Sequence, residues 1–559
     1  MITAWSLRYS YSRLFICFPL SGILSRIPAH GFACLPAMID IQVLLYVLLA
    51  TAGLALVQRY QIVGHSRKLR HPPSPKSLPF FGNLFSIPPG LDHLAYLELG
   101  KKLKSDIVYL DMMGQPVIIL NSAQAAVDLF EKRSAIYSDR VCPPMVKDPE
   151  LLNWSTFISV LPYNDLWRRQ RRRMNNWLNL HAVRQFDGLQ QDTIRGLLSR
   201  LLDLSSNPQP FKEVKHQLFF AMGSATFKLA YGYRHTNDQD PFLLNAVQAT
   251  DNLFDATMMS NFLVNAFPAL SCIPDWFPGT RWKYTARKWR NNKNHAVDAP
   301  YEWTKKQIAT GEFEPSVLSA LLQDHKPISG LPTEDRDKEL KELGYILFAG
   351  GTETIATALM GFIAAMVANP EVQIKAQAEI DSALGYGTRL PMISDEARLP
   401  YVRNLILEVL RWQPVAPTGG TPHTNCQDDV YEGYDIQKGT MLIGNLWAMS
   451  RNKTSYKNPE NFEPDRFLDP TVPHLPAFGW GRRKCAGMHF AEVSLFLGIS
   501  SLLTTFTFSR KKDKDGKEII PTIEGAYNSL TMVLKPFDFE IRPRSEKHRQ
   551  LILENIPKE

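Results

Sequence analysis

The stretch FGWGRRKCAG at residues 478–487 decides the fold, because it holds a single cysteine, Cys485, behind three cations and before a mostly apolar segment. That segment, Ala486 to Leu503, predicts a helix, and cations together with the N–H groups of a helix start stabilise a thiolate. Gly481 and Gly487 allow a tight turn and leave room for a flat ligand beside the backbone. We therefore interpret the stretch as a loop that presents a thiolate to haem iron.

Cys485 has two simpler interpretations. It can be a small buried hydrophobe, the commonest fate of a free cysteine, or it can form half of a zinc site with His489. Zinc usually takes four ligands in two close pairs, and no second Cys/His pair of suitable spacing exists in the sequence. The pattern F-x-x-G-x-R-x-C-x-G, in contrast, resembles the haem-binding signature of the cytochrome P450 superfamily. It is satisfied at Phe478, Gly481, Arg483, Cys485 and Gly487.

The resemblance implies a mainly α fold with a small β region, in which helices enclose haem b. By the same resemblance the Cys485 thiolate ligates the iron, and Phe478 and Gly487 lie close to the macrocycle. Arg483 is expected to bind a haem propionate. His423 stands where the family commonly has another propionate partner.

A run of arginines in WRRQRRRM, residues 167–174, is the second informative element. On a helix Trp167, Arg171 and Met174 share one face, and the other arginines mostly point elsewhere. The segment resembles the W-x-x-x-R element of the family, which implies that Trp167 and Arg171 bind a propionate. The other arginines form a solvated face, a nucleic-acid site or a docking surface for an acidic electron donor. We favour the donor, because no aromatic ladder or nucleic-acid motif accompanies the charge.

A long helix is predicted from Thr333 to Ala368. AGGTET, residues 349–354, lies in its middle, and paired glycines there indicate that something approaches the backbone. Glu353 and Thr354 can be a locally satisfied polar pair in a helix kink. The segment also resembles the oxygen-activation element of the family, which implies that both residues deliver protons to bound dioxygen. It departs from that element at Ile355, where the family has a hydroxyl residue.

Glu408 and Arg411 are spaced i,i+3 on an amphipathic helix predicted from Tyr401 to Trp412. As an exposed ion pair they would mean little. The E-x-x-R pair resembles a family element in which a later arginine completes a buried triad, and Arg466 matches that arginine. The role implied for the triad is structural, bracing the haem side of the fold.

Composition and charge bear on the location of the protein. The chain has 559 residues, a net charge of +8 and six scattered cysteines, which suit a reducing compartment and form no disulfide framework. An uncharged apolar run at residues 41–57 is just long enough to span a bilayer, and cations follow it. We favour an uncleaved single-pass anchor over a signal peptide, because no clear cleavage site is present. The cationic flank then places the rest of the chain in the cytosol.

The sequence therefore predicts four parts. These are an N-terminal extension (1–37), a membrane anchor with its basic flank (38–70), a proline-rich hinge (71–79) and a haem-thiolate catalytic domain (80–559). The arrangement is similar to that of eukaryotic microsomal members of the family, which implies an endoplasmic-reticulum location.

The function that the resemblance implies is a monooxygenase similar to fungal secondary-metabolism hydroxylases. Its expected substrate is a small apolar molecule such as a terpenoid, indole or polyketide, oxidised with O2. The chain has no Walker loop or well-placed dinucleotide fingerprint, so electrons are expected from a separate NADPH-cytochrome reductase. Two alternatives stay open: a haem-thiolate isomerase or dehydratase that needs no external electrons, and a non-catalytic haem-binding membrane protein.

Overall fold

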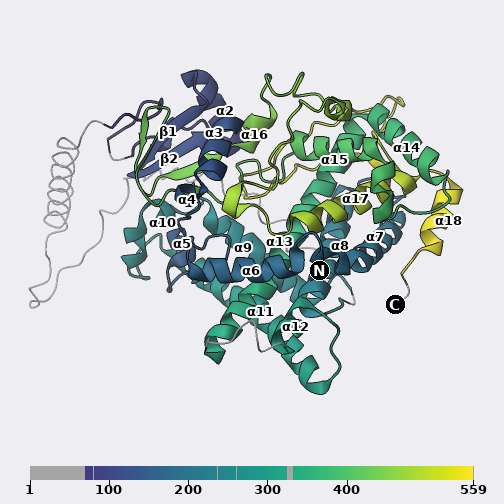
Figure 1. The fold of residues 1–559 in the computed structure, drawn as a ribbon, viewed down its shortest axis with the longest axis horizontal. Helices are drawn as coiled ribbons and strands as arrows, with labels where there is room; N and C mark the ends of the chain where they lie inside the picture. The colour runs from purple at the N-terminus through teal and green to yellow at the C-terminus, as the bar shows by residue number, and fades with distance from the viewer. Residues whose placement is uncertain (1–68, 80, 236, 260, 324–331, 558–559) are drawn as a thin grey trace, which may run out of the picture. The chain divides into compact units, whose positions relative to one another are not determined.

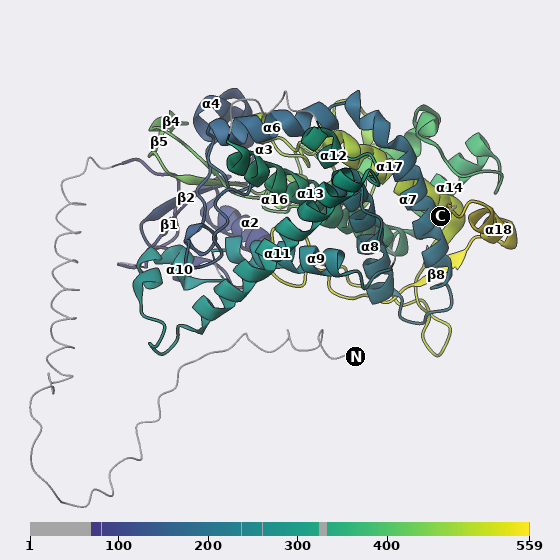
Figure 2. The same cartoon turned by 90° about the horizontal axis from the view of Figure 1, so that it is seen from below.

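The central element of the computed structural model is α13 (Thr333–Ala368), a single helix of 36 residues. Its first turn contains Glu334 and Asp335, whose negative charges interact favourably with the positive end of the helix dipole and stabilise the helix start. At 1.5 Å per residue α13 is about 54 Å long, and both views show it crossing the helical region (Figures 1 and 2). The long helix predicted from the sequence is confirmed, and it continues without a break through residues 349–354.

The structure describes residues 69–79, 81–235, 237–259, 261–323 and 332–557. The chain divides after Leu69, and the features reported below belong to the second unit, Arg70–Glu559. The predicted N-terminal extension, the apolar run at residues 41–57 and most of its basic flank lie outside the described residues.

Most of the described chain is helical with a small β region, as expected from the sequence. The other α-helices are α2 (Asp92–Leu103), α3 (Ala123–Ala126), α4 (Ser134–Tyr137), α5 (Pro144–Lys147), α6 (Asp165–Leu178), α7 (Asp187–Leu202), α8 (Phe211–Tyr231), α9 (Pro241–Thr257), α10 (Leu263–Ala266), α11 (Arg281–Thr310), α12 (Val317–Gln323), α14 (Pro370–Leu384), α15 (Pro400–Trp412), α16 (Leu446–Ser450), α17 (Met488–Thr505) and α18 (Glu546–Glu554). The strands are β1 (Ile107–Met112), β2 (Gln115–Leu120), β3 (His423–Thr424), β4 (Asp429–Tyr431), β5 (Tyr434–Ile436), β6 (Met441–Gly444), β7 (Phe506–Ser509) and β8 (Glu540–Pro543).

A four-stranded sheet with the order β1-β2-β6-β3 joins distant parts of the chain. β1 and β2 form an antiparallel hairpin, and Met113 and Gly114 take positive φ in its turn. β6 pairs parallel to β2, and β3 pairs antiparallel to β6. Because β3 begins at His423, the sheet positions one of the residues that the sequence assigned to the site.

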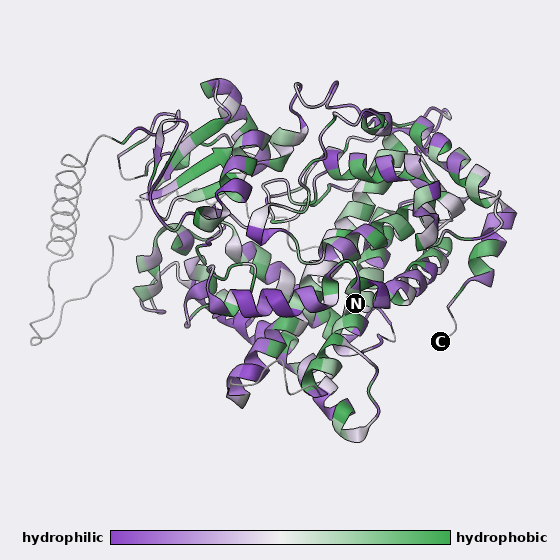
Figure 3. Ribbon diagram, in the orientation of Figure 1, coloured by the Kyte–Doolittle hydropathy of each residue, from purple (hydrophilic) through white to green (hydrophobic). Residues whose placement is uncertain are grey.

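Two helices in the described part of the chain are long and apolar enough to cross a membrane, namely α17 and the part Glu334–Ala368 of α13. Both are mostly buried inside the fold, and α13 packs against α17, α8 and α11. Hydrophobic residues dominate α17, whereas α6 is largely hydrophilic (Figure 3). The apolar character of α13 and α17 therefore builds the core.

The proline-rich segment that starts at His71 packs along β1. The rings of His71 and Tyr109 stack with their centroids 4.1 Å apart, and the Pro73 carbonyl accepts a hydrogen bond from the Tyr109 N–H at 3.0 Å. The start of the segment is therefore fixed to the β region instead of spanning open solvent.

Between α9 and α11, residues 262–280 form α10, a short helical turn at Pro268–Cys272 and further turns. Leu263, Phe267, Trp276 and Phe277 are exposed there, and Trp276 keeps 80% of its surface accessible. Exposed apolar side chains gathered in one segment are a common feature of surfaces that bind lipid or another apolar partner.

Candidate active site

The cysteine loop lies between a short helical turn, η8 (Gly481–Arg483), and the start of α17. The Cys485 N–H donates to the Phe478 carbonyl at 2.8 Å and closes the loop. Gly481 has a φ of +52°, and a Cβ there would lie 2.1 Å from the Phe130 carbonyl oxygen. Gly481 therefore allows close packing of the chain on itself. Its positive φ confirms the predicted tight turn, whereas its Cβ direction faces the Phe130 carbonyl and not open space beside the backbone.

Gly487 fits the expectation better. It precedes the first residue of α17, and an added Cβ would meet no atom within 4 Å. Gly350, in the middle of α13, is exposed, and the nearest atom to a Cβ there belongs to Ile346 at 4.0 Å. Open space therefore lies beside the backbone at both glycines, as a flat cofactor requires.

Cys485 is exposed by its surface area, although protein atoms surround its sulfur closely. Both observations hold if the exposed surface opens onto space inside the fold. Burial raises the pKa of the Cys485 thiol, and the N–H of Gly487 and the charge of Arg171 oppose that rise. The protein alone therefore favours the thiol form, and a bound metal ion is needed to favour the thiolate.

The sequence suggests that all three cations of the loop stabilise the Cys485 thiolate. The structure differs from this expectation. Arg482 and Lys484 are exposed, and Arg483 is buried against backbone carbonyls. The cation that acts most on the thiol is Arg171 of α6, whose guanidinium donates to the Lys484 carbonyl. The positive charge that acts on the Cys485 thiol is therefore supplied by α6 and not by the neighbouring cations of the loop.

Arg483 joins three segments of the chain. Its Nε donates to the Ser138 carbonyl at 2.7 Å and its Nη2 to the Leu161 carbonyl at 2.8 Å. Its guanidinium carbon lies 4.5 Å from the centre of the Trp167 ring. Nη1 is buried without a hydrogen-bond partner among the described residues. An unsatisfied buried donor on a cation is costly, so this atom fits an anionic group of a ligand.

Arg140 belongs to the same cluster, and sequence reasoning missed it. Its Nε is also buried without a partner in the part of the chain that the structure describes. Burial, then the nearby charges of Arg483 and Arg171, lower the pKa of Arg140. Like charges gather in this way where an anion compensates them, and the two propionates of haem would do so. No spacing motif marks Arg140, so only the fold could reveal it.

His423 lies at the edge of this cluster. Its ring is buried, stacks on Phe130 with centroids 4.2 Å apart, and donates from Nδ1 to the Tyr137 carbonyl at 2.8 Å. The pKa of His423 is lowered to about 3, mainly by burial and also by the charge of Arg140, while the bond to Tyr137 opposes the change. The ring is therefore neutral at neutral pH, and its Nε2 is a hydrogen-bond acceptor. A nearby anion would raise the pKa of the ring and favour a proton on Nε2.

α6 carries Trp167 and Arg171 on one face, as expected, and Trp167 is buried. The Asn164 side chain accepts the Trp167 N–H at 2.9 Å and caps the helix. Arg173 is buried and pairs with Glu339 of α13, and Arg169 pairs with the same carboxylate at 2.7 Å. The expected basic surface is therefore smaller than the arginine run suggested. Arg168 and Arg172 are the exposed cations of this run.

Thr354 lies one turn after Gly350 on the same face of α13, and its hydroxyl donates to the Gly350 carbonyl at 2.7 Å. A Cβ at Gly351 would come within 2.6 Å of the Thr226 side chain on α8. The paired glycines thus serve two purposes, since Gly351 permits helix packing and Gly350 leaves open space. The helix assignment of α13 continues through this segment, and the Thr354 hydroxyl is satisfied within the helix, as expected for a locally satisfied polar residue.

Glu353 points toward a different partner from Thr354. The Thr531 hydroxyl donates to Oε1 of Glu353. The pKa of Glu353 is raised to about 7, mainly by burial and also by the charges of Asp251 and Asp255, while the Thr531 hydrogen bond and Lys215 oppose the rise. A carboxyl group with a pKa near neutrality can give up and take back protons at neutral pH.

Two clefts adjoin these residues. The first cleft is lined by polar and apolar residues that include Asp92, Pro417, Asn528, Thr531 and Met532. The second cleft is lined by residues that include Phe219, Val247, Phe348, Ala349 and Glu353. Pro417 and Thr418 contribute to the walls of the first cleft, and Phe348 and Ala349 contribute to those of the second.

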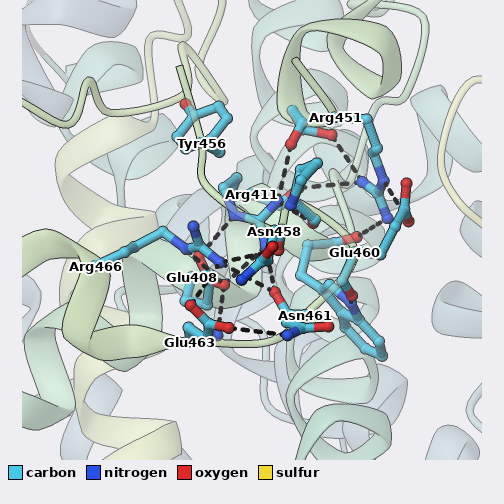
Figure 4. Close-up of polar contacts among 12 residues, drawn as sticks. Glu408, Arg411, Arg451, Tyr456, Asn458, Glu460, Asn461, Glu463 and Arg466 are labelled. Carbon is cyan, nitrogen blue, oxygen red and sulfur yellow. Dashed lines mark hydrogen bonds and ion pairs between the residues drawn. The ribbon is translucent and has the colours of Figure 1, made fainter. Parts of the chain in front are cut away.

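The Glu408, Arg411 and Arg466 triad forms as the sequence indicated (Figure 4). Arg411 donates to both carboxylate oxygens of Glu408 at 2.7 Å, and Arg466 donates to Oε1 at 3.1 Å. Glu408 and Arg411 have no exposed surface. Arg411 also donates to the carbonyls of Ser450 and Pro459, so the triad ties α15 to the chain before the cysteine loop.

Comparison with known proteins agrees with this geometry. The family model of cytochrome P450 matches residues 72–542. Cytochrome P450 monooxygenase COX2 of Coprinopsis cinerea is 34% identical over 510 residues, covering 90% of this chain and 94% of that protein. Cytochrome P450 monooxygenase ple1 of Rhodocybe pseudopiperita is 36% identical over 515 residues, covering 90% and 94%. Tryptamine 4-monooxygenase of Psilocybe cyanescens is 34% identical over 484 residues, covering 85% and 93%. The chain therefore belongs to the cytochrome P450 family and is a monooxygenase that binds haem through a cysteine thiolate.

Proposed function

We propose that this monooxygenase hydroxylates or otherwise oxidises a small apolar molecule in secondary-metabolite biosynthesis. The observation that carries the proposal is the likeness to named monooxygenases over most of the chain. The second cleft, about 10 Å³ in volume, is too small to hold such a molecule, but Phe348 and Ala349 give its walls an apolar character beside Glu353. Pockets of this composition bind apolar ligands and orient them through a few polar groups. One relative is by its name a tryptamine 4-monooxygenase, which supports an indole among the candidate substrates.

Several side chains are proposed to hold the haem. Cys485 is the iron ligand, and Phe478 and Gly487 border the ring. The propionates are proposed to lie between Arg483, Trp167, Arg171 and His423. The unpartnered Nη1 of Arg483 supports this arrangement, because a carboxylate would satisfy it.

Glu353 and Thr354 are proposed to manage protons. When bound, the haem iron supplies the activation of dioxygen. Glu353 can donate a proton at neutral pH because its pKa lies near 7. Thr354 lies beside the open space at Gly350, where its hydroxyl can join a hydrogen-bonded chain that carries the proton. The buried apolar residues Phe348 and Ala349 limit the access of bulk water to the Glu353 carboxyl group.

Electrons are proposed to come from an NADPH-cytochrome reductase with an acidic surface. Arg168 and Arg172 on α6 and Arg482 and Lys484 on the cysteine loop are exposed cations that support docking there. We place the enzyme on the endoplasmic reticulum, with a single-pass anchor and the catalytic domain in the cytosol. The exposed apolar residues at 263–277 support contact with lipid.

Product identification tests the proposal most broadly. The purified enzyme is reconstituted with a reductase and NADPH and given a panel of terpenoids, indoles and polyketides. The expected result is an oxygenated product that depends on NADPH and contains oxygen from labelled dioxygen. Turnover without reductase and NADPH would instead indicate an isomerase or dehydratase. A haem-loaded protein that oxidises no NADPH with any compound would favour a non-catalytic role.

A further inference from the structure

Thr531 is the partner of Glu353 that no motif in the sequence indicated. Its hydroxyl donates to Oε1 of Glu353, and the residue is only 4% exposed. Glu353 lies on α13, whereas Thr531 lies 178 positions later, between β7 and β8. The contact is therefore made by the tertiary fold, and it fixes one oxygen of the carboxylate.

The turn that carries Thr531 is held at its base. The Ala526 N–H donates to the Val533 carbonyl at 2.7 Å, and the Met532 N–H donates to the Val415 carbonyl at 2.8 Å. A hydroxyl on such a fixed backbone loses little entropy when it forms its hydrogen bond, so it can orient a partner well.

The tip of the same turn is held by Asn528. The Asp92 N–H donates to Oδ1 of Asn528 at 2.8 Å, and Nδ2 of Asn528 donates back to Oδ1 of Asp92 at 3.0 Å. Thr531 lines the first cleft and Glu353 lines the second. The hydrogen bond between them thus joins a wall of one cleft to a wall of the other.

The charged groups around Glu353 come from two other helices. Asp251 and Asp255 on α9 raise its pKa, and Lys215 on α8 lowers it. After burial, the Thr531 hydroxyl has the largest influence, and it lowers the pKa because it donates to the ionised carboxylate. Thr531 thus stabilises Glu353 in the state that follows the release of a proton.

We propose that Thr531 is a positioning residue for proton delivery, because its hydroxyl holds the Glu353 carboxylate in one orientation and stabilises the anion left after each transfer. Each transfer moves one proton from Glu353 toward the face of α13 that carries Thr354, and water returns one proton to Glu353. The proposal rests on the proton role proposed above for Glu353. A purely structural threonine would affect folding stability alone.

The test uses full-length, haem-loaded enzyme and two readouts. Infrared difference spectra follow the titration of the Glu353 carboxyl group, with Glu353→Gln to identify its band. Hydrogen peroxide released per NADPH consumed, with reductase and dioxygen and no added substrate, reports how well protons are delivered. The variants are Thr531→Val, which removes the donor, and Thr531→Ser, which keeps it. Thr522→Val is the matched control on an exposed threonine of the same segment.

In Thr531→Val we expect the Glu353 titration to move upward by about one pH unit, the size expected for losing one hydrogen bond to a carboxylate. Peroxide per NADPH should rise, while Thr531→Ser and Thr522→Val match the parent. A Thr531→Val enzyme that titrates and releases peroxide like the parent would overturn the inference, even if its melting temperature falls. If Glu353→Gln itself leaves peroxide release unchanged, the proton role of Glu353 fails instead.

Discussion

Arg483 lies over Trp167, with its guanidinium carbon 4.5 Å from the centre of the indole ring, and thereby joins the cysteine loop to α6. The same guanidinium donates to two backbone carbonyls and keeps Nη1 buried without a partner among the described residues. A flat, always charged group is suited to stacking and to binding a carboxylate at once. If Arg483 binds a propionate as proposed, this contact connects the stability of the loop with the binding of haem.

Arg483→Lys tests that connection. Lysine keeps the charge but loses the stacking and cannot reach both carbonyls, so the free energy of unfolding should fall by about 2–3 kcal/mol. Haem content per polypeptide should fall with it. Both are measured on purified protein, by denaturant unfolding and by haem extraction. Arg482→Lys is the neighbouring control, because Arg482 is exposed and its replacement should change stability by less than about 0.5 kcal/mol. Equal effects of the two variants would contradict the assignment.

Glu408→Gln tests the buried triad. The substitution leaves Arg411 charged and buried without its bidentate partner, which should cost about 3–5 kcal/mol of folding free energy. We expect little haem-loaded protein at the temperature where the parent accumulates. Glu463→Gln is the control, since Glu463 also approaches Arg466 but its side chain is 41% exposed, and an exposed ion pair contributes about 0–1 kcal/mol. Comparable losses in both variants would show that burial of the triad does not matter.

The proposed contact between His423 and a haem propionate predicts that haem binding takes up protons. The His423 pKa of about 3 means that the haem-free protein holds the ring neutral, with Nδ1 donating to the Tyr137 carbonyl. A propionate accepts hydrogen bonds, so Nε2 must gain a proton to bind one, and the anion raises the pKa. Between the haem-free and haem-bound pKa values, binding takes up protons, and affinity falls as pH rises.

Calorimetry of haem binding in buffers of different ionisation enthalpy measures that uptake. We expect His423→Gln to lower it by up to one proton per haem. The same uptake in the parent and the variant would place the propionate away from His423.

Arg172→Glu tests docking of the electron donor. Arg172 is an exposed cation on α6, so reversing its charge should slow association with an acidic reductase and weaken the dependence of that rate on salt. We expect the rate of haem reduction to fall several-fold at low ionic strength, with the haem spectrum unchanged. Arg281→Glu on α11 changes the net charge equally and serves as the comparison. An identical fall in both variants would mean that net charge, and not a docking surface, sets the rate.

Elements with strong local signals could be predicted from the sequence. The apolar run that ends before Pro370 predicted α13, and Glu408 and Arg411 form their pair because helical spacing of three residues brings them together. The order of the motifs along the chain also indicated the family. In each case the information lies in neighbouring residues or in a signature pattern.

Contacts between distant segments could not be predicted in the same way. Arg140 reaches the site through the loop that follows α4, and Thr531 meets Glu353 from a turn near the end of the chain. Arg173 pairs with Glu339, which an arginine run cannot reveal. Gly481 packs against the Phe130 carbonyl, so the same glycine pattern that suggested a ligand serves chain packing. Each outcome depends on a partner that only the fold brings close.

The measurement that tests the central claim most directly is the absorption spectrum of the ferrous carbon monoxide complex of the purified protein. If Cys485 ligates the iron, the parent shows the red-shifted band that a thiolate ligand produces, and Cys485→Ser loses it. A parent without haem, or a Cys485→Ser protein with the same carbon monoxide spectrum as the parent, would contradict the account.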